Sequence, residues 1–261
     1  MLRYNLTIVQ KICLAGIFIP LVAIFQKIFA VNYIPIVPFV RISFGGPALI
    51  IFASILLGPW FGLMVGAFSD LVGFFMFDPK MFGSLPFFQI TAIYALLGFS
   101  SYFVFKLIHK IANTKLMVYI ECGTFLALLI GATLFLIFND SIALYGVEYQ
   151  IELIHRILVP IILFILLLVL FLITLFFNRF FKKRSVNISV FHISFSCFIL
   201  ELFVMLIFGS IMKAWAFSTT TFLAIFLSQL LVFFFNIPLN TFLISYIMSS
   251  TRKLFKAIEY A

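Results

Sequence analysis

Residues 41–78 read RISFGGPALIIFASILLGPWFGLMVGAFSDLVGFFMFD, and this stretch decides how the rest of the chain is arranged. Two apolar runs are separated by a helix-breaking Gly-Pro pair. From this break onward, small or acidic residues recur at every fourth position, at Gly58, Gly62, Gly66 and Asp70. A helix places them along one face, which lets a second helix approach closely. A carboxylate inside a membrane costs about 2.5–3.5 kcal/mol, so we expect Asp70 to have a partner that anchors this seam.

The composition places the whole chain in a lipid bilayer. Its 261 residues are 65% hydrophobic and 10% charged, with a mean hydropathy of +1.29. Soluble domains carry about 25% charged residues. Hydrocarbon offers no water to backbone groups, and the apolar runs lack the alternation of barrel strands, so they are predicted to be helices. We therefore predict an all-α, polytopic transmembrane helical bundle.

Runs of about 17–25 apolar residues predict eight spans, of which the second is short. They lie at about residues 8–31, 44–57, 60–77, 87–107, 116–138, 152–178, 189–212 and 222–250. With this even count, twelve of the 17 Lys and Arg residues fall on the side of both termini, and such an excess marks the cytoplasm. We predict a multi-pass cell-membrane protein with both termini cytoplasmic. The twelve are Arg3, Lys11, Lys106, Lys110, Lys115, Arg179, Lys182, Lys183, Arg184, Arg252, Lys253 and Lys256.

The other five cations fall on the opposite side, and three of them are candidates for binding an anion: Arg41, Lys80 and Arg156. Together they could form a basic mouth on the outer side, because clefts with apolar walls focus charge. Such a pocket would suit a ligand whose flat ring system lies between aromatic side chains and whose carboxylate pairs with an arginine. Alternatively, the two arginines extend to lipid headgroups beside an aromatic belt. The aromatic residues nearby in the sequence are Phe39, Phe44, Phe82, Phe87, Phe88, Tyr94 and Tyr145.

Two acidic residues fall within other predicted spans. Glu121 lies about one turn inside its helix, and we expect it to extend toward Lys110 or Lys115. Glu201 lies near the middle of the 189–212 span, where it is either one half of an interhelical hydrogen bond or a proton- or cation-coupled site. Its candidate partners are Gln229, Asn236 and Asn240.

Several function classes find no support in the sequence. The net charge of +9 is spread in short clusters between apolar runs, so nucleic acid is not an expected partner. Motifs for nucleotide phosphate, zinc proteases and serine hydrolases are absent. The three cysteines, Cys13, Cys122 and Cys197, stand singly in apolar runs and are expected to be small packing residues. We therefore expect a non-enzymatic protein with no cofactor and no metal site.

The 41–73 region resembles the substrate-binding S component of energy-coupling factor (ECF) vitamin importers, the folate type in particular. The matching segments are Arg41-Ile42-Ser43-Phe44-Gly45, Leu57-Gly58-Pro59-Trp60-Phe61-Gly62, Val65-Gly66 and Ser69-Asp70-Leu71-Val72-Gly73. Weaker likeness covers about residues 6–178 through Tyr94-Ala95-Leu96-Leu97-Gly98, Tyr145-Gly146 and Arg156-Ile157-Leu158-Val159-Pro160.

The resemblance implies a six-helix core that captures a vitamin at its outer face. Such a core docks onto a transmembrane coupling protein driven by two ABC-type ATPases and topples to release its cargo inward. With the aromatic Tyr145 added, the expected substrate-binding residues are Arg41, Lys80, Gln89, Tyr94, Tyr145 and Arg156.

The chain departs from the family pattern in two places. The family's docking helix shows Ala-x-x-x-Ala, whereas here Ala15 is followed by Ile19 and then Ala23, so Ala15 and Ala23 are the candidate docking residues. Helices beyond the sixth exceed the family's usual number. Either residues 181–261 are an additional hairpin with a cytoplasmic tail, appended to a core of residues 1–180, or the family's last helix pair aligns with that hairpin. The Tyr145-Gly146 and Arg156 likeness favours the first option.

The sequence thus leads to a main hypothesis and two alternatives. The main one is a substrate-capture subunit for an anionic vitamin, folate before riboflavin or pantothenate. The first alternative is a self-sufficient secondary transporter that couples to ions through Glu201, Asp70 or Glu121. The other is an intramembrane enzyme acting on lipid, for which the sequence shows no convergent catalytic groups.

Overall fold

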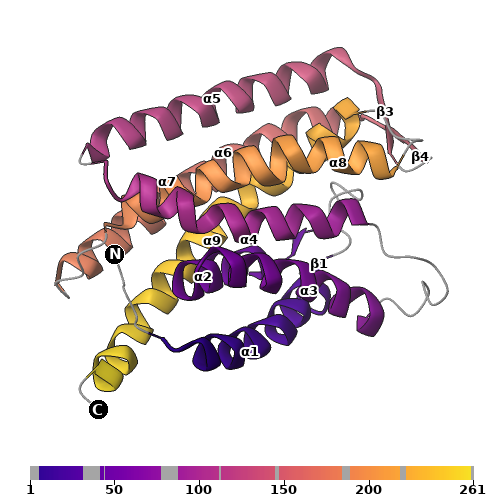
Figure 1. Ribbon diagram of the computed structural model, residues 1–261. Coiled ribbons are helices and arrows are strands. Elements are labelled where there is room, and N and C mark those ends of the chain that lie inside the picture. Colours follow the sequence, from indigo (N-terminus) through magenta and orange to yellow (C-terminus); the bar gives the residue numbers. More distant parts are fainter. Residues whose placement is uncertain are drawn as a thin grey trace.

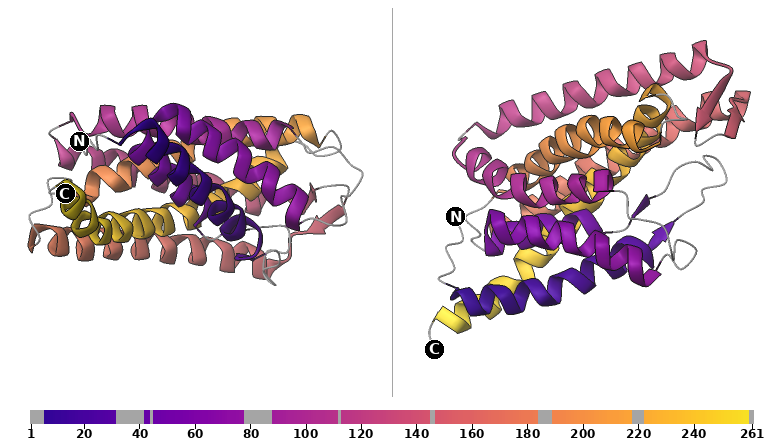
Figure 2. Two further views of the ribbon diagram at one scale, coloured as in Figure 1. Left: turned by 60° about the horizontal axis from the view of Figure 1, so that its bottom comes forward. Right: turned by 45° about the vertical axis from the view of Figure 1, so that its right-hand side comes forward.

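The structure is a computed structural model that describes residues 6–31, 42–43, 45–77, 88–111, 113–144, 147–183, 189–217 and 222–259. These residues form a bundle of helices with two short antiparallel ribbons (Figures 1 and 2). One ribbon pairs β1 (Ala30–Val31) with β2 (Ile42–Ser43), and the other pairs β3 (Ser141–Leu144) with β4 (Val147–Gln150). The predicted class, an all-α bundle of the multi-pass membrane type, is confirmed.

Among the described residues, seven helical stretches are long and apolar enough to cross a membrane. The stretch from Val190 to Ala216 is one continuous helix whose middle part is a π-helix. The second of the eight predicted spans, at 44–57, is a helix of only 12 residues, which extends about 18 Å and is shorter than the hydrocarbon core of about 30 Å. The helices are α1 (Ile8–Lys27), α2 (Gly46–Leu57), α3 (Pro59–Phe77), α4 (Phe88–Ile108), α5 (Thr114–Phe138), α6 (Leu153–Lys183), α7 (Val190–Leu200), η2 (Glu201–Phe208), α8 (Gly209–Ala216) and α9 (Phe222–Glu259).

Two glycines and two prolines set the ends of α2. Gly45 precedes the helix with a φ of 82°, and Pro47 follows in the first turn, where its missing N–H group leaves no bond unmade. Gly58 ends the helix with φ 101° and ψ 172°, a conformation that only glycine adopts without strain. Pro59 then begins α3. This sharp turn folds α2 back against α3.

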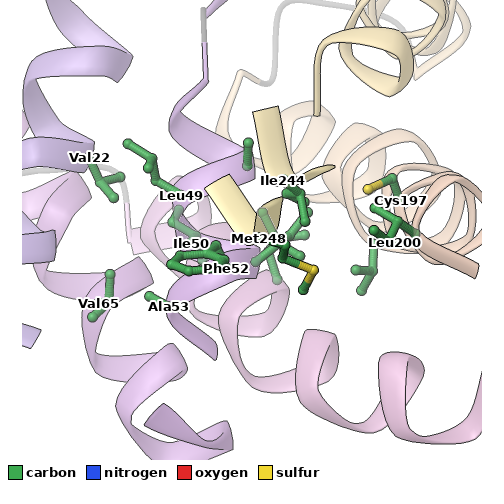
Figure 3. Close-up of a cluster of buried hydrophobic side chains, with 14 of the residues drawn as sticks. Val22, Leu49, Ile50, Phe52, Ala53, Val65, Cys197, Leu200, Ile244 and Met248 are labelled. Carbon is green, nitrogen blue, oxygen red and sulfur yellow. The ribbon is translucent and has the colours of Figure 1, made fainter. Parts of the chain in front are cut away.

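The short helix α2 is apolar on every side because it is buried on every side. Ten of its twelve residues are buried. Figure 3 shows Leu49, Ile50, Phe52 and Ala53 between side chains from four other helices. These are Val22 from α1, Val65 from α3, Cys197 and Leu200 from α7, and Ile244 and Met248 from α9.

The α7–α8 helix and α9 lie at the centre of the bundle, with α1–α4 on one side and α5–α6 on the other (Figure 1). Within their most apolar stretches, 56% of the α7–α8 residues and 61% of the α9 residues are buried, compared with 22% in α5 and in α6. One apolar cluster joins α7 and α9 to α1–α4, and a second joins them to α5 and α6 through Phe125, Phe198, Phe233 and Phe234. The hairpin that the sequence analysis treated as an appendage is therefore central.

The two ends of the bundle are distinct. The start of α1 and the end of α9 lie at the same end, which we call the terminal end (Figures 1 and 2). Both ribbons lie toward the opposite end, which we call the ribbon end.

Candidate functional site

The helices α3 and α4 pack with their backbones in contact. A Cβ built on Gly62 would lie 2.5 Å from the Gly98 carbonyl oxygen, and one built on Gly66 would overlap the carbonyl group of Tyr94. The glycine spacing along α3 therefore places bare backbone where α4 passes. Gly58 is not part of this contact with α4. It forms the turn before α3, and an added Cβ there would meet nothing within 4 Å.

Asp70 continues this seam one turn further along α3. Its side chain is buried, and Thr91 of α4 donates a hydrogen bond of 2.7 Å to its Oδ2 atom. Ser69 is buried beside it and donates to the Gly66 carbonyl within the same helix. Asp70 thus links the two helices that the glycines bring together.

The expected substrate-binding residues fall into three groups. Arg41, Lys80 and Tyr145 lie outside the described residues. Gln89 and Tyr94 lie on α4, which packs on α2, α3, α7 and α8. Arg156 lies on α6, which packs on α5, α7 and α9. The central helices therefore separate Arg156 from Gln89 and Tyr94, and the structure does not bring these three together.

Arg156 is held by residues that precede the second ribbon. Its Nη2 atom donates to the Asp140 carboxylate at 2.5 Å and to the Asn139 carbonyl oxygen at 3.3 Å. The Asp140 side chain is 94% exposed, so this ion pair contributes at most about 1 kcal/mol. The Nε atom of Arg156 is buried and donates no hydrogen bond.

The two candidate docking residues, Ala15 and Ala23, are buried. Ala15 belongs to the apolar cluster that α1 shares with α2 and α3, and the Ala23 side chain has no exposed surface. Other residues form the exposed face of α1, so in this conformation the two alanines do not present a surface to a partner. The exposed large hydrophobic residues of that helix are Ile8, Val9, Ile12, Ile17 and Leu21.

Glu201 forms the most deeply buried acidic site of the described residues. Its side chain is 1% exposed, and Asn240 of α9 donates a hydrogen bond of 2.7 Å from Nδ2 to its Oε1 atom. Asn236, one turn earlier on α9, also faces this carboxylate. Three oxygens at this site have no hydrogen-bond partner: Glu201 Oε2, Asn236 Oδ1 and Asn240 Oδ1. The third candidate partner, Gln229, instead accepts a hydrogen bond of 2.6 Å from Lys213.

The backbone around Glu201 is irregular on both helices. Glu201 is the first residue of the π-helix η2, and such segments occur often at functional sites. On α9, Pro238 follows Asn236 within the helix and cannot donate a backbone hydrogen bond. The sequence signals the proline, whereas no pattern in residues 201–208 predicts a π-helix.

Glu121 turns inward and does not extend to the lysines. It is buried, and Ser194 of α7 donates a hydrogen bond of 2.8 Å to its Oε1 atom. The expectation that it reaches Lys110 or Lys115 is therefore wrong. The rotational position of Glu121 on α5 points it at the central helix.

Two histidines meet at the terminal end. The rings of His109 and His192 lie 5.8 Å apart, and the Nε2 atom of His192 lies 3.0 Å from the Ile111 carbonyl oxygen. Partial burial lowers the pKa of His109, and the nearby charge of His192 lowers it further. Protonation of His109 is therefore disfavoured in the folded protein.

Comparison of the chain with protein-family models, with curated proteins and with solved structures finds no match. Any functional assignment therefore depends on the residues and contacts described above.

Proposed function

We propose that the protein is the membrane-embedded substrate-capture subunit of an ATP-driven importer of the ECF type. Its cargo would be a small anionic vitamin, with folate before riboflavin and pantothenate. The observation that carries this proposal is the contact between α3 and α4. These helices carry the residues that resemble the S components. Gly58 forms the turn before α3, and Gly62 and Gly66 lie in the backbone contact. Asp70 accepts a hydrogen bond across it.

The central position of α7–α8 and α9 supports the second of the two alignments that the sequence left open. In this proposal the six-helix core consists of α1–α4, the α7–α8 helix and α9. The helices α5 and α6 are then an added pair that packs on the outside of the core. Arg156 belongs to this added pair, so it would not contact the vitamin directly.

The charge distribution supports an outward-facing ribbon end. Among the described residues, Lys11, Lys106, Lys115 and Arg179 lie near helix ends at the terminal end, and short cytoplasmic segments carry such an excess. The α1–α2 and α3–α4 connections, which carry Arg41 and Lys80 in the sequence, join helix ends at the ribbon end. Gln89 lies in the first turn of α4 at this end, and Tyr94 lies between one and two turns further along. An anionic vitamin arriving from outside would meet these residues first.

Vitamin uptake by cells that express the protein tests the proposal. Uptake should need ATP hydrolysis by two ABC-type ATPases that purify with the protein through a transmembrane coupling protein. The matched control is a cell in which the ATPases carry inactivating changes while the protein is present at the same level. Uptake that persists in this control would contradict the proposal.

The buried Glu201–Asn240 pair favours one alternative, a self-sufficient secondary transporter that couples to ions. In that case uptake would not depend on ATP hydrolysis and would be abolished by Glu201→Gln. The same uptake assay therefore separates the two functions.

A further inference from the structure

Polar side chains meet at three levels along the contact between the α7–α8 helix and α9. The Cys197 thiol faces the Thr241 hydroxyl, Glu201 accepts a hydrogen bond from Asn240, and Lys213 donates to Gln229. Residues 197 and 213 are separated by about 24 Å of helix at 1.5 Å per residue, most of the thickness of a hydrocarbon core of about 30 Å. The polar contacts therefore extend across most of the membrane, with Glu201 between the other two.

The site around Glu201 has more hydrogen-bond acceptors than donors. The three atoms without a partner are the second carboxylate oxygen of Glu201 and the amide oxygens of Asn236 and Asn240. All three are acceptors when the carboxylate is ionised. An ionised carboxylate buried in apolar surroundings is costly unless it is paired, and an unmade hydrogen bond to a buried group costs about 1–3 kcal/mol.

The charged groups around the site do not neutralise Glu201. The π-helix η2 packs on α4, α7, α8 and α9. Among the titratable residues of these helices, Cys197 lies near Glu201, and the charge of Lys213 acts on Glu201 while Lys213 donates a hydrogen bond to Gln229. Within the described part of the chain, Glu201 forms no ion pair. The remaining titratable residues on these helices are Tyr94, Tyr102, Lys106, His192, Tyr246, Arg252, Lys253, Lys256 and Glu259.

We propose that Glu201 is a proton-binding site in the middle of the bundle. The carboxylate takes one proton from water and becomes a carboxylic acid, whose Oε2–H group donates to the amide oxygen of Asn240 or Asn236. The amide of Asn240 continues to donate to Oε1. One proton thus converts an acceptor into a donor and removes the charge. Release of the proton restores the ionised carboxylate with the Asn240 hydrogen bond intact. This site is independent of whether the protein captures a vitamin.

Infrared spectroscopy of the full-length protein in lipid tests the proposal directly. Difference spectra between acidic and alkaline pH should show the C=O stretch of a protonated carboxyl group that shifts in heavy water. We expect this band to be lost in Glu201→Gln and kept in Glu121→Gln. The second variant is the matched control, since it removes another buried carboxylate that is hydrogen-bonded to a neighbouring helix. A band unchanged in Glu201→Gln would overturn the proposal.

A second variant keeps the test decisive if Glu201→Gln does not fold. Asn240→Leu retains the carboxyl group and removes its amide partner, so the band should remain and move to higher frequency. No shift would overturn the proposal. The spectra are recorded in a buffer whose cation is choline, and replacing this choline with Na⁺ at constant pH should leave the band unchanged. Loss of the band in Na⁺ would show that a metal cation occupies the site and would also overturn it.

Discussion

The backbone of Gly66 in α3 touches that of Tyr94 in α4, so a Cβ on Gly66 would overlap the Tyr94 carbonyl group. One turn earlier Gly62 meets Gly98, and one turn later Asp70 accepts a hydrogen bond from Thr91. Three successive turns of α3 therefore contact one neighbour, and the first two leave no space for a side chain. A carboxylate at the end of this contact fixes the two helices against each other.

Gly66→Ala should lower the free energy of unfolding by about 1–3 kcal/mol, because the added methyl group has to displace backbone rather than a flexible side chain. Unfolding of the purified protein by heat in mild detergent measures the change. The matched control is Gly131→Ala in α5, where an added Cβ meets nothing within 4 Å. The control should be neutral or stabilising by up to about 1 kcal/mol. Equal destabilisation by both variants would contradict the contact.

Gly58→Ala tests the turn between α2 and α3 separately from the seam. Nothing lies within 4 Å of an added Cβ, so the only cost is a backbone conformation of φ 101° and ψ 172° that other residues rarely adopt. We expect a loss of about 1–3 kcal/mol. Gly16→Ala, in open space on α1, is the matched control and should not destabilise. An unaltered melting temperature for Gly58→Ala would show that the turn tolerates an ordinary residue.

Glu201→Gln and Glu201→Ala should differ sharply in stability. Glutamine keeps the acceptor for Asn240 and adds an N–H donor for the unpaired amide oxygens, so its melting temperature should equal or exceed that of the natural protein. Alanine leaves the buried Asn240 amide without its acceptor and should cost about 1–3 kcal/mol, plus the cost of the cavity. If glutamine destabilised as much as alanine, the carboxyl group would have to be ionised in the folded protein.

The sequence predicted the helices well, because length and apolarity are enough to identify a span. It also predicted that Asp70 would have a partner and that Asn240 was a candidate partner for Glu201, since polar groups in hydrocarbon seek one another. It did not predict which helices lie in the centre. Lipid tails are as apolar as leucine, so apolarity does not by itself mark a central helix: the most apolar stretch of α6 has a mean hydropathy of 3.4 and is 22% buried, whereas that of α9 has 2.1 and is 61% buried.

The candidate site was less predictable than the fold. The direction of Glu121 depends on the rotation of α5, and one residue turns a helical side chain by about 100°. A one-residue difference is smaller than the uncertainty of a predicted boundary. The likeness at Arg156 similarly indicated a core helix, whereas α6 packs on the outer side of α7 and α9. Sequence alone did not show which helix pair lies at the centre of the bundle.

Arg41→Ala and Arg156→Ala should affect vitamin binding unequally. Loss of the counter-charge at Arg41 should weaken binding at least tenfold, which corresponds to about 1.4 kcal/mol. Arg156 lies across the central helices from Gln89 and Tyr94, so its loss should have a much smaller effect. Isothermal titration of the purified variants measures both. Equal losses would return Arg156 to the binding site and would contradict the assignment of α5–α6 as an added pair.

The most direct test of the substrate-capture proposal is equilibrium binding of radiolabelled folate to the purified full-length protein. The account predicts saturable binding of one molecule per chain. Unlabelled folate should compete with it, Arg41→Ala should weaken it at least tenfold, and Lys115→Ala, at the terminal end, should leave it unchanged. If neither folate nor riboflavin nor pantothenate binds to the folded protein, the account is contradicted.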